Sequence, residues 1–323
     1  MSPTCKIGNS TFSAIGFGAM GLSMGYGAVD SDEERFKVLD AAHTAGCTFW
    51  DTADVFKRTG KRSDIFLATK FGFTHDLTID GSPTHVRAAA ASSLKRLGVD
   101  TIDLFYLHRA DKNTSIEITV GAMAELVKEG KVKHLGLSEV SAATLRRAHA
   151  VHPIAAVQVE YSPFTLDIED PKINLLNTAR ELGVKIVAYS PLGRGLLTGQ
   201  YKSPDNFEPD DFRRMLPRYS AANFPNILAL ATGLKTIGTK HGATAGQVAL
   251  AWLLAQGDDV IPIPGTKKIK YLAENIGAGS LALAPADVQV VRDVAATADA
   301  AHGDRYPAAF MGQLFCETPP LHA

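Results

Sequence analysis

Short apolar runs alternate in regular order with segments of helical hydrophobic spacing along most of the chain. Strands that alternate with helices in this way indicate βα units and a parallel sheet. The expected strands cover residues 14–18, 48–51, 65–70, 102–108, 132–138, 156–160, 185–189 and 260–264. The expected helices cover residues 31–45, 84–97, 115–129, 142–150, 173–182 and 285–297, with a further pair inside 226–256. About eight such units without a linker between halves predict an α/β fold, a (β/α)8 TIM barrel, formed by residues 1–323 as one domain.

One connection is too short for this pattern. Only nine residues, Val55 to Ser63, separate the expected strand that ends near Asp51 from the next one. A parallel crossover needs about a dozen residues or more. We therefore expect the second helix of the barrel to be missing or truncated.

The stretch Gly16-Phe-Gly-Ala-Met-Gly21 matches the G-x-G-x-x-G pattern of dinucleotide-binding loops, with Asp40 about twenty residues further on. In that motif a helix opens directly after the last glycine, beneath the pyrophosphate. Here the next helix begins near Ser31, where Ser31 and Glu34 form a capping-box pattern. We interpret the glycines as turns around the first barrel strand.

Three polar residues, Asp51, Lys70 and His108, stand at the ends of expected strands. A single Lys or His in such a place is more often a surface residue or a hydrogen-bonded histidine than a catalyst. Three of them at the carboxyl ends of consecutive strands favour the functional interpretation, because that end of a barrel carries the chemistry. An aspartate beside a lysine keeps the ammonium charged, and a histidine can orient a carbonyl oxygen. The set contains no obvious proton donor.

Composition narrows the protein class. The chain has 46% hydrophobic and 21% charged residues and a formal net charge of -1, as in ordinary globular proteins. Without a basic tract or a long apolar run, we expect neither nucleic acid nor a membrane as a partner. Three widely spaced cysteines without CxxC pairs indicate neither a disulfide framework nor a metal site. A cytoplasmic location is the expectation, and the stretch from Tyr201 to Phe224 is expected to form a long loop or lid over the barrel mouth.

Several short motifs follow one another in a specific order and spacing. They are Asp51-Thr-Ala-Asp54, Ala68-Thr-Lys-Phe71, Asp103-Leu-Phe-Tyr-Leu-His108, Gly136-Leu-Ser138, Gln158-Val-Glu-Tyr161, Ala188-Tyr-Ser-Pro-Leu-Gly-Arg-Gly195 and Ile263-Pro-Gly-Thr266 with Glu274-Asn275. In these motifs the chain resembles the aldo-keto reductases over nearly its whole length. It is most similar to the members that resemble pyridoxal reductase and the potassium-channel β-subunits.

The resemblance implies a catalytic set of Asp, Tyr, Lys and His, of which Asp51, Lys70 and His108 are present. The tyrosine of the family would fall five residues after the aspartate, where this chain has Phe56. Because the residues after Phe56 resemble the family's segment before the third strand, we interpret Phe56 as a junction left by deletion of the second helix. General acid catalysis contributes about 10²- to 10⁴-fold, so its loss would weaken carbonyl reduction. Tyr26, His108 and an ordered water are the alternative proton donors.

The resemblance also implies an NADPH site. Ser138 and Gln158 would hold the nicotinamide carboxamide, and Tyr189 would stack on the ring. The pyrophosphate would lie beside Leu192, Gly193 and Arg194, and the adenine beside Glu274 and Asn275. The extra phosphate of NADPH would bind the lysine-rich loop with Gly265, Thr266, Lys267 and Lys270, although Tyr271 stands where the family often has an arginine.

Two hypotheses follow for the function. The first is an NADPH-dependent oxidoreductase that reduces a small aldehyde or ketone to an alcohol. The second is a protein that binds NADPH without efficient catalysis, as a pseudoenzyme or a regulatory subunit. The sequence leaves the substrate and the oligomeric state open.

Overall fold

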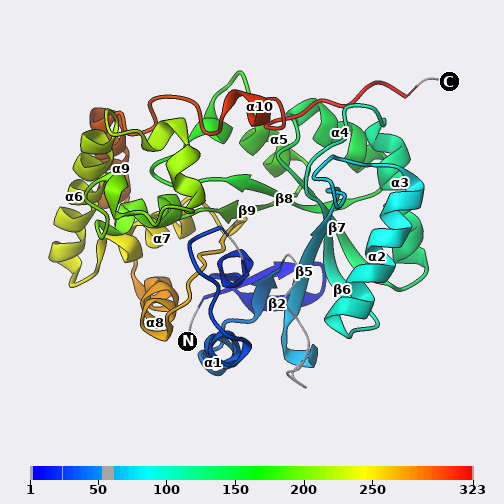
Figure 1. Cartoon of the computed structure of the whole chain (residues 1–323), viewed down its shortest axis with the longest axis horizontal. Helices are drawn as coiled ribbons and strands as arrows, with labels where there is room; N and C mark the ends of the chain where they lie inside the picture. Colours follow the sequence, from blue (N-terminus) through cyan, green and yellow to red (C-terminus); the bar gives the residue numbers. More distant parts are fainter. Residues whose placement is uncertain (1–2, 24, 53–61, 322–323) are drawn as a thin grey trace.

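The computed structural model describes residues 3–23, 25–52 and 62–321. Its centre is an eight-stranded parallel sheet that curls into a barrel, with helices around the outside (Figure 1). The strands follow the chain order around the sheet: β3 (Phe17–Gly18), β4 (Phe49–Asp51), β5 (Phe66–Phe71), β6 (Ile102–Leu107), β7 (Val132–Ser138), β8 (Ile154–Glu160), β9 (Lys185–Tyr189) and β10 (Val260–Pro262). The predicted (β/α)8 fold is confirmed.

Glycines join the first strand of the barrel to the last. The N–H of Gly16 donates to the carbonyl of Pro262 at 2.9 Å, and the N–H of Gly18 donates to Pro264 at 3.1 Å. A Cβ atom on Gly18 would lie only 2.6 Å from the carbonyl oxygen of Ile263, so a side chain would hold the two backbones apart. These glycines therefore serve close backbone contact at the seam. A three-residue 3-10 helix, Met20–Leu22, follows them, and the next α-helix starts at Asp32, well outside a dinucleotide-binding loop.

Helices follow the strands as the pattern predicts. They are α1 (Asp32–Thr44), α2 (Pro83–Leu97), α3 (Ile116–Lys128), α4 (Ala142–Val151), α5 (Leu175–Glu181), α6 (Phe224–His241), α7 (Ala245–Leu254), α8 (Ile269–Gly277), α9 (Pro285–Ala298) and the short α10 (Ala308–Met311). The side chain of Ser31 caps α1 by accepting from the N–H of Glu34. Gly98 ends α2 in the left-handed conformation, with φ +65°.

Some elements were not predicted from the sequence, among them the short helix α10, the N-terminal hairpin and helix α8. An antiparallel hairpin, β1 (Thr4–Ile7) with β2 (Ser10–Ser13), precedes the barrel. Helix α8 begins within the lysine-rich segment that was expected to be a loop. Between β4 and β5 the described part holds one 3-10 turn, Arg62–Asp64. Residues 53–61, with Phe56, lie outside the described residues, so the deletion of the second helix stays a prediction.

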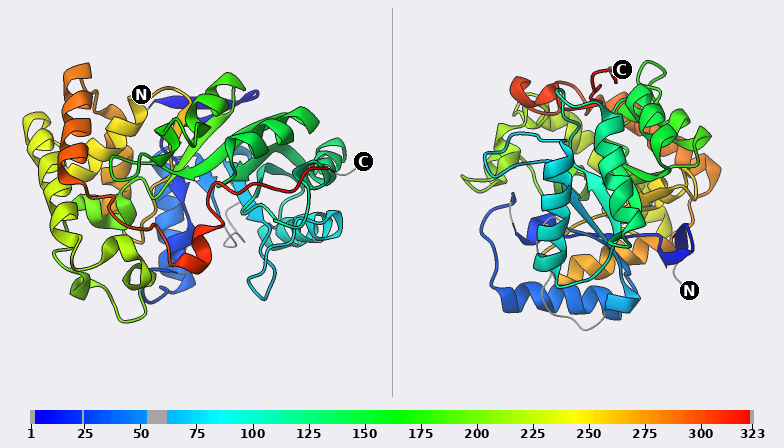
Figure 2. Two further views of the ribbon diagram at one scale, coloured as in Figure 1. Left: turned by 90° about the horizontal axis from the view of Figure 1, so that it is seen from above. Right: turned by 90° about the vertical axis from the view of Figure 1, so that its right-hand side faces the viewer.

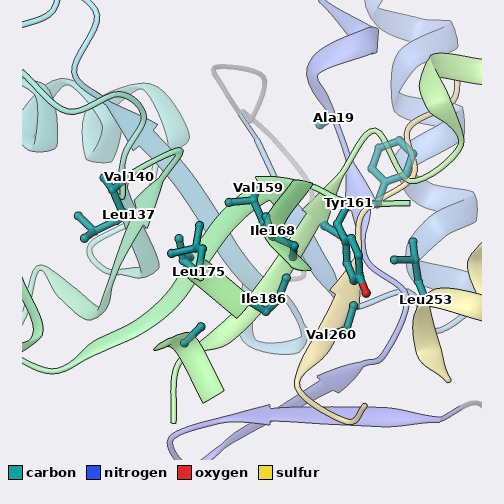
Figure 3. Close-up of a cluster of buried hydrophobic side chains, with 14 of the residues drawn as sticks. Ala19, Leu137, Val140, Val159, Tyr161, Ile168, Leu175, Ile186, Leu253 and Val260 are labelled. Carbon is teal, nitrogen blue, oxygen red and sulfur yellow. The ribbon is translucent and has the colours of Figure 1, made fainter. Parts of the chain in front are cut away.

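The barrel wall separates two apolar layers. Inside, side chains such as Phe49, Leu104 and Ile261 pack against the hairpin residues Phe12 and Ile7. Outside, the strands pack against the helices, and Figure 3 shows part of this layer. Its strand members in the figure are Leu137, Val159, Ile186 and Val260, each fully buried. This double burial explains why the strands read as continuous apolar runs.

Two segments without long helices complete the molecule. Residues 201–223 contain three short 3-10 helices, in agreement with the predicted long loop. After α9 the chain runs as an extended segment across one end of the barrel to the far side (Figures 1 and 2). Hydrogen bonds fix its far part, from Ser115 to the carbonyl of Pro320 and from Arg147 to Thr318, each 2.8 Å. No helix in the described ranges is both long and apolar enough to cross a membrane.

Candidate active site

Asp51, Lys70 and Gln158 meet inside the barrel mouth. Asp51 is the last residue of β4, and Lys70 lies near the end of the neighbouring strand β5. One carboxylate oxygen of Asp51 forms an ion pair with Lys70 Nζ. The other, Oδ2, accepts a hydrogen bond of 2.7 Å from Nε2 of Gln158 on β8. The structure thus unites two predicted catalytic residues with a predicted cofactor residue, and all three side chains are nearly buried.

Tyr106 on β6 lies directly next to this cluster. It is paired with Lys70 in the sheet register, and Lys70 Nζ lies 5.6 Å from the centroid of its ring. Its hydroxyl is buried and has no hydrogen-bond partner in the part of the chain that the structure describes. Burial, and then the charge of Asp51, raise the pKa of Tyr106 well above its usual value. The sequence analysis did not single out this tyrosine, although it lies within the motif that ends at His108.

His108 follows β6 at the barrel mouth. The backbone N–H of His108 donates to the carbonyl of Phe71 at 2.7 Å. Its imidazole ring packs edge-on against the ring of Phe73, with the ring centroids 5.1 Å apart. Burial lowers the pKa of His108 well below 6.5, and the charges of Arg109 and Lys70 lower it further. The imidazole is therefore neutral near pH 7, and a neutral ring can donate a hydrogen bond but carries no extra proton to release.

The next predicted residue, Ser138, ends β7 beside the histidine loop. Nη1 of Arg109 donates to the Oγ atom of Ser138 at 3.3 Å and to the backbone carbonyl of His108 at 2.7 Å. This arginine connects the ends of β6 and β7. It is a part of the site that the sequence analysis missed.

Tyr189, the predicted ring-stacking residue, ends β9. Its hydroxyl donates to Oε1 of Glu139 at 2.8 Å. Burial, and then the negative charge of Glu139, raise the pKa of Tyr189 well above its usual value, so the phenol stays protonated. Glu139 is fully buried and adopts a left-handed backbone conformation, with φ +51°. The sequence signal was an acidic residue immediately after the Gly136-Leu-Ser138 motif.

The residues after β9, which were predicted to lie beside the pyrophosphate, form a tight turn. Leu192 precedes this turn, and Gly193 and Arg194 both have positive φ angles, of +54° and +55°. The guanidinium of Arg194 does not lie free, because Nη2 is 3.2 Å from Oε2 of Glu160 and 2.7 Å from the hydroxyl of Tyr306. Arg194 is therefore engaged with the end of β8 and with the C-terminal segment.

A second group of predicted residues lies at the seam, where β10 leads into α8. Lys267 holds the loop between β3 and α1, since its Nζ donates to the carbonyls of Tyr26 at 2.9 Å and Ala28 at 2.7 Å. Oε1 of Glu274 accepts from Thr244 at 2.7 Å. The remaining members lie in the same loop and helix: Gly265 against Gly18, Thr266 bonded to the N–H of Lys268, Lys270 over the ring of Tyr271, and the nearly buried Asn275.

The family model described as "Aldo/keto reductase family" matches residues 14–296. The chain belongs to the aldo-keto reductase family. This membership confirms the resemblance drawn from the motifs and identifies the protein as an oxidoreductase.

Two curated relatives align with this aldo-keto reductase over nearly their whole length. Aldo-keto reductase str7 of Strobilurus tenacellus is 64% identical, with 99% of this chain and 98% of the relative covered. Aldo-keto reductase yakc [NADP(+)] of Schizosaccharomyces pombe is 49% identical, with the same coverage. The alignments extend over 335 and 337 positions, more than the 323 residues of this chain, so they include positions at which this aldo-keto reductase has no residue.

Among solved structures, the glycerol dehydrogenase AKR11B4 of Gluconobacter oxydans superposes with a TM-score of 0.82 at 25% identity. The superposition covers 93% of this aldo-keto reductase and 97% of the other chain. The likeness supports the barrel and the position of its carboxyl-end mouth.

Proposed function

We propose that the protein reduces the carbonyl group of a small aldehyde or ketone to an alcohol, with NADPH as the reductant. The observation that carries this proposal is the Asp51–Lys70–Gln158 cluster beside His108 at the barrel mouth. Family membership and the name of the NADP(+)-dependent relative support the choice of cofactor. The comparisons give no support to the second hypothesis, a protein that binds NADPH without efficient catalysis.

The residues present fit a nicotinamide cofactor. Beside Ser138, Oε2 of Glu139 is buried without a hydrogen-bond partner among the described residues, so an acceptor is free where the carboxamide is expected. At the other end, Lys267 and Lys270 bring positive charge to the start of α8, as a phosphate requires. When bound, the reduced nicotinamide supplies the hydride for the carbonyl carbon.

The chain's own residues then orient the substrate and handle the proton. Neutral His108 donates a hydrogen bond to the carbonyl oxygen and orients it. Its lowered pKa argues against His108 as the proton donor. The contacts of Tyr26 lie away from this cluster: its ring is 5.2 Å from the guanidinium of Arg213, and its backbone carbonyl accepts from Lys267.

We therefore place the proton transfer at Nζ of Lys70, directly or through a water. The ammonium gives a proton to the oxygen of the new alcohol and regains one from solvent. The same ammonium forms the ion pair with Asp51, and this contact must loosen when Nζ turns to the substrate oxygen. We expect turnover to be slow for this reason.

The test is a titration with NADPH by fluorescence, followed by addition of 4-nitrobenzaldehyde and of pyridoxal while the absorbance of the reduced cofactor is recorded. Lys70→Met should abolish turnover and leave NADPH affinity nearly unchanged. Lys185→Met is the matched control, because Lys185 lies at the opposite end of a barrel strand. If the wild-type protein binds NADPH but turns over neither aldehyde, the reductase proposal is wrong, and the result supports a protein that binds NADPH without efficient catalysis.

A further inference from the structure

The C-terminal segment, residues 299–321, brings a buried arginine into the barrel mouth. Nη2 of Arg305 donates to Oε1 of Glu139 at 2.7 Å and to the hydroxyl of Tyr189 at 2.9 Å. Since Tyr189 also donates to the same Glu139 oxygen, the three side chains form a closed triangle of hydrogen bonds. The side chain of Arg305 is only 3% exposed and that of Glu139 is 0% exposed, so water does not substitute for these contacts.

Two buried carboxylates explain why a cation is required at the position of Arg305. They lie at the ends of neighbouring strands, Glu139 directly after β7 and Glu160 as the last residue of β8. Arg305 lies 2.7 Å from the first and 3.6 Å from the second. Burial acts to raise the pKa of Glu160, but Arg305 and Arg194 outweigh it and lower that pKa. Removal of the guanidinium would leave the buried carboxylate of Glu139 without this ion-pair partner.

We propose that Arg305 is a positioning residue for the nicotinamide end of the cofactor site. It fixes the ring of Tyr189 and the carboxylate of Glu139, so the C-terminal segment takes part in cofactor binding. This inference rests on the proposed NADPH-dependent function.

The buried carboxylate of Glu139 has one oxygen with hydrogen-bond partners and one without any among the described residues. Arg305 and Tyr189 occupy Oε1, while Oε2 has no partner in the described part of the chain. A carboxylate held in this way offers one fixed acceptor, and a carboxamide NH₂ group is a matching donor. A lysine at position 305 would keep the charge but not the guanidinium, whose Nη2 donates to both Glu139 and Tyr189 while Nη1 lies 3.5 Å from Asp167.

The first measurement compares two ligands by calorimetry, NADPH and adenosine 2′,5′-bisphosphate, which lacks the nicotinamide end. Arg305→Lys should weaken NADPH binding about tenfold, the scale of a lost hydrogen bond to a charged group, and change the binding of the bisphosphate less than about twofold. The emission of bound NADPH should change in the same variant.

The matched control is Arg147→Gln. Arg147 also holds the C-terminal segment, through the carbonyls of Thr318 at 2.8 Å and Pro319 at 2.6 Å, but does not contact Tyr189. This variant should leave both affinities unchanged. If both arginine variants weaken NADPH binding alike, the effect comes from a loosened segment and the proposal is wrong.

A second variant combines Arg305→Met with Glu139→Gln. It removes both charges of this ion pair together, so it leaves neither partner charged and alone, and it serves as the test if the single variants fold poorly. It should lose NADPH affinity and keep the affinity for the bisphosphate. Equal loss for both ligands, or no loss for either, would overturn the positioning role. A wild-type protein that binds neither ligand would instead overturn the proposed function, and this inference with it.

Discussion

Gly136 on β7 makes room for the ring of Tyr106 on β6. The two residues are paired in the sheet register, and a Cβ atom on Gly136 would lie 2.4 Å from Cδ1 of the tyrosine. The space left by a missing side chain on one strand thus places an aromatic ring beside Lys70. Substitutions of Gly136 and of Tyr106 both test this contact.

Gly136→Ala should destabilise the protein. The tyrosine ring is fully buried and cannot move aside without disturbing its neighbours, and overpacking of this kind costs about 1–3 kcal/mol. Urea unfolding measures the change, with Gly121→Ala as the control, because a Cβ atom on Gly121 in α3 meets nothing within 4 Å. The control should gain about 0.5–1 kcal/mol in the helix. An alanine at 136 without loss of stability would contradict the observed fit.

Tyr106→Phe should leave the free energy of unfolding unchanged or raise it, because the buried hydroxyl has no partner to lose among the described residues. Tyr161→Phe is the comparison, since the hydroxyl of Tyr161 donates to Glu169. That variant should lose about 1–2 kcal/mol. Similar losses in both variants would show that Tyr106 has a hydrogen-bond partner, such as a water, in solution.

The pH dependence of stability should report the buried imidazole of His108. In the unfolded chain this group takes up a proton as the pH falls below about 6.5, whereas its lowered pKa prevents this in the folded protein. Its contribution to stability is therefore complete above that pH and is lost as the pH falls. His108→Asn should flatten the decline in unfolding free energy between about pH 7 and pH 5, and the exposed His302→Asn should not. An unchanged slope in His108→Asn would contradict the assignment.

Lys267→Met should release the loop between β3 and α1 and reduce the preference for NADPH over NADH. The ammonium of Lys267 donates to the carbonyls of Tyr26 and Ala28 and supplies positive charge for the phosphate of NADPH. An uncharged side chain cannot do both. We expect limited proteolysis near Ala28 to be faster and the ratio of the two affinities to fall about tenfold. Lys240→Met, on the exposed end of α6, should change neither quantity.

The sequence predicted the barrel well where burial produces continuous apolar runs. Strands β7 and β9 have the predicted bounds, Val132–Ser138 and Lys185–Tyr189, because both faces of each strand are covered. The hairpin of β1 and β2 was missed because its strands are short and partly exposed. Helix α8 was missed because it begins at Ile269, inside the lysine-rich segment that was interpreted as a loop.

Strand ends also predicted the Asp51–Lys70 pair, since parallel strands bring their carboxyl ends to one face. Glu139 and Arg305 could not be paired in the same way. They lie 166 residues apart, and Arg305 belongs to a segment without periodicity, so only the folded chain brings them together. The roles assigned to the cofactor residues stay predictions that the binding experiments address.

The position of Arg305 near the end of the chain has a consequence for biosynthesis. All eight barrel strands are translated before Arg305, the residue that neutralises Glu139. Until the final segment emerges, the nascent barrel carries carboxylates at its mouth that lack one of their cations. A chain that terminates before this segment would therefore retain every strand and yet lack the cation that pairs with Glu139.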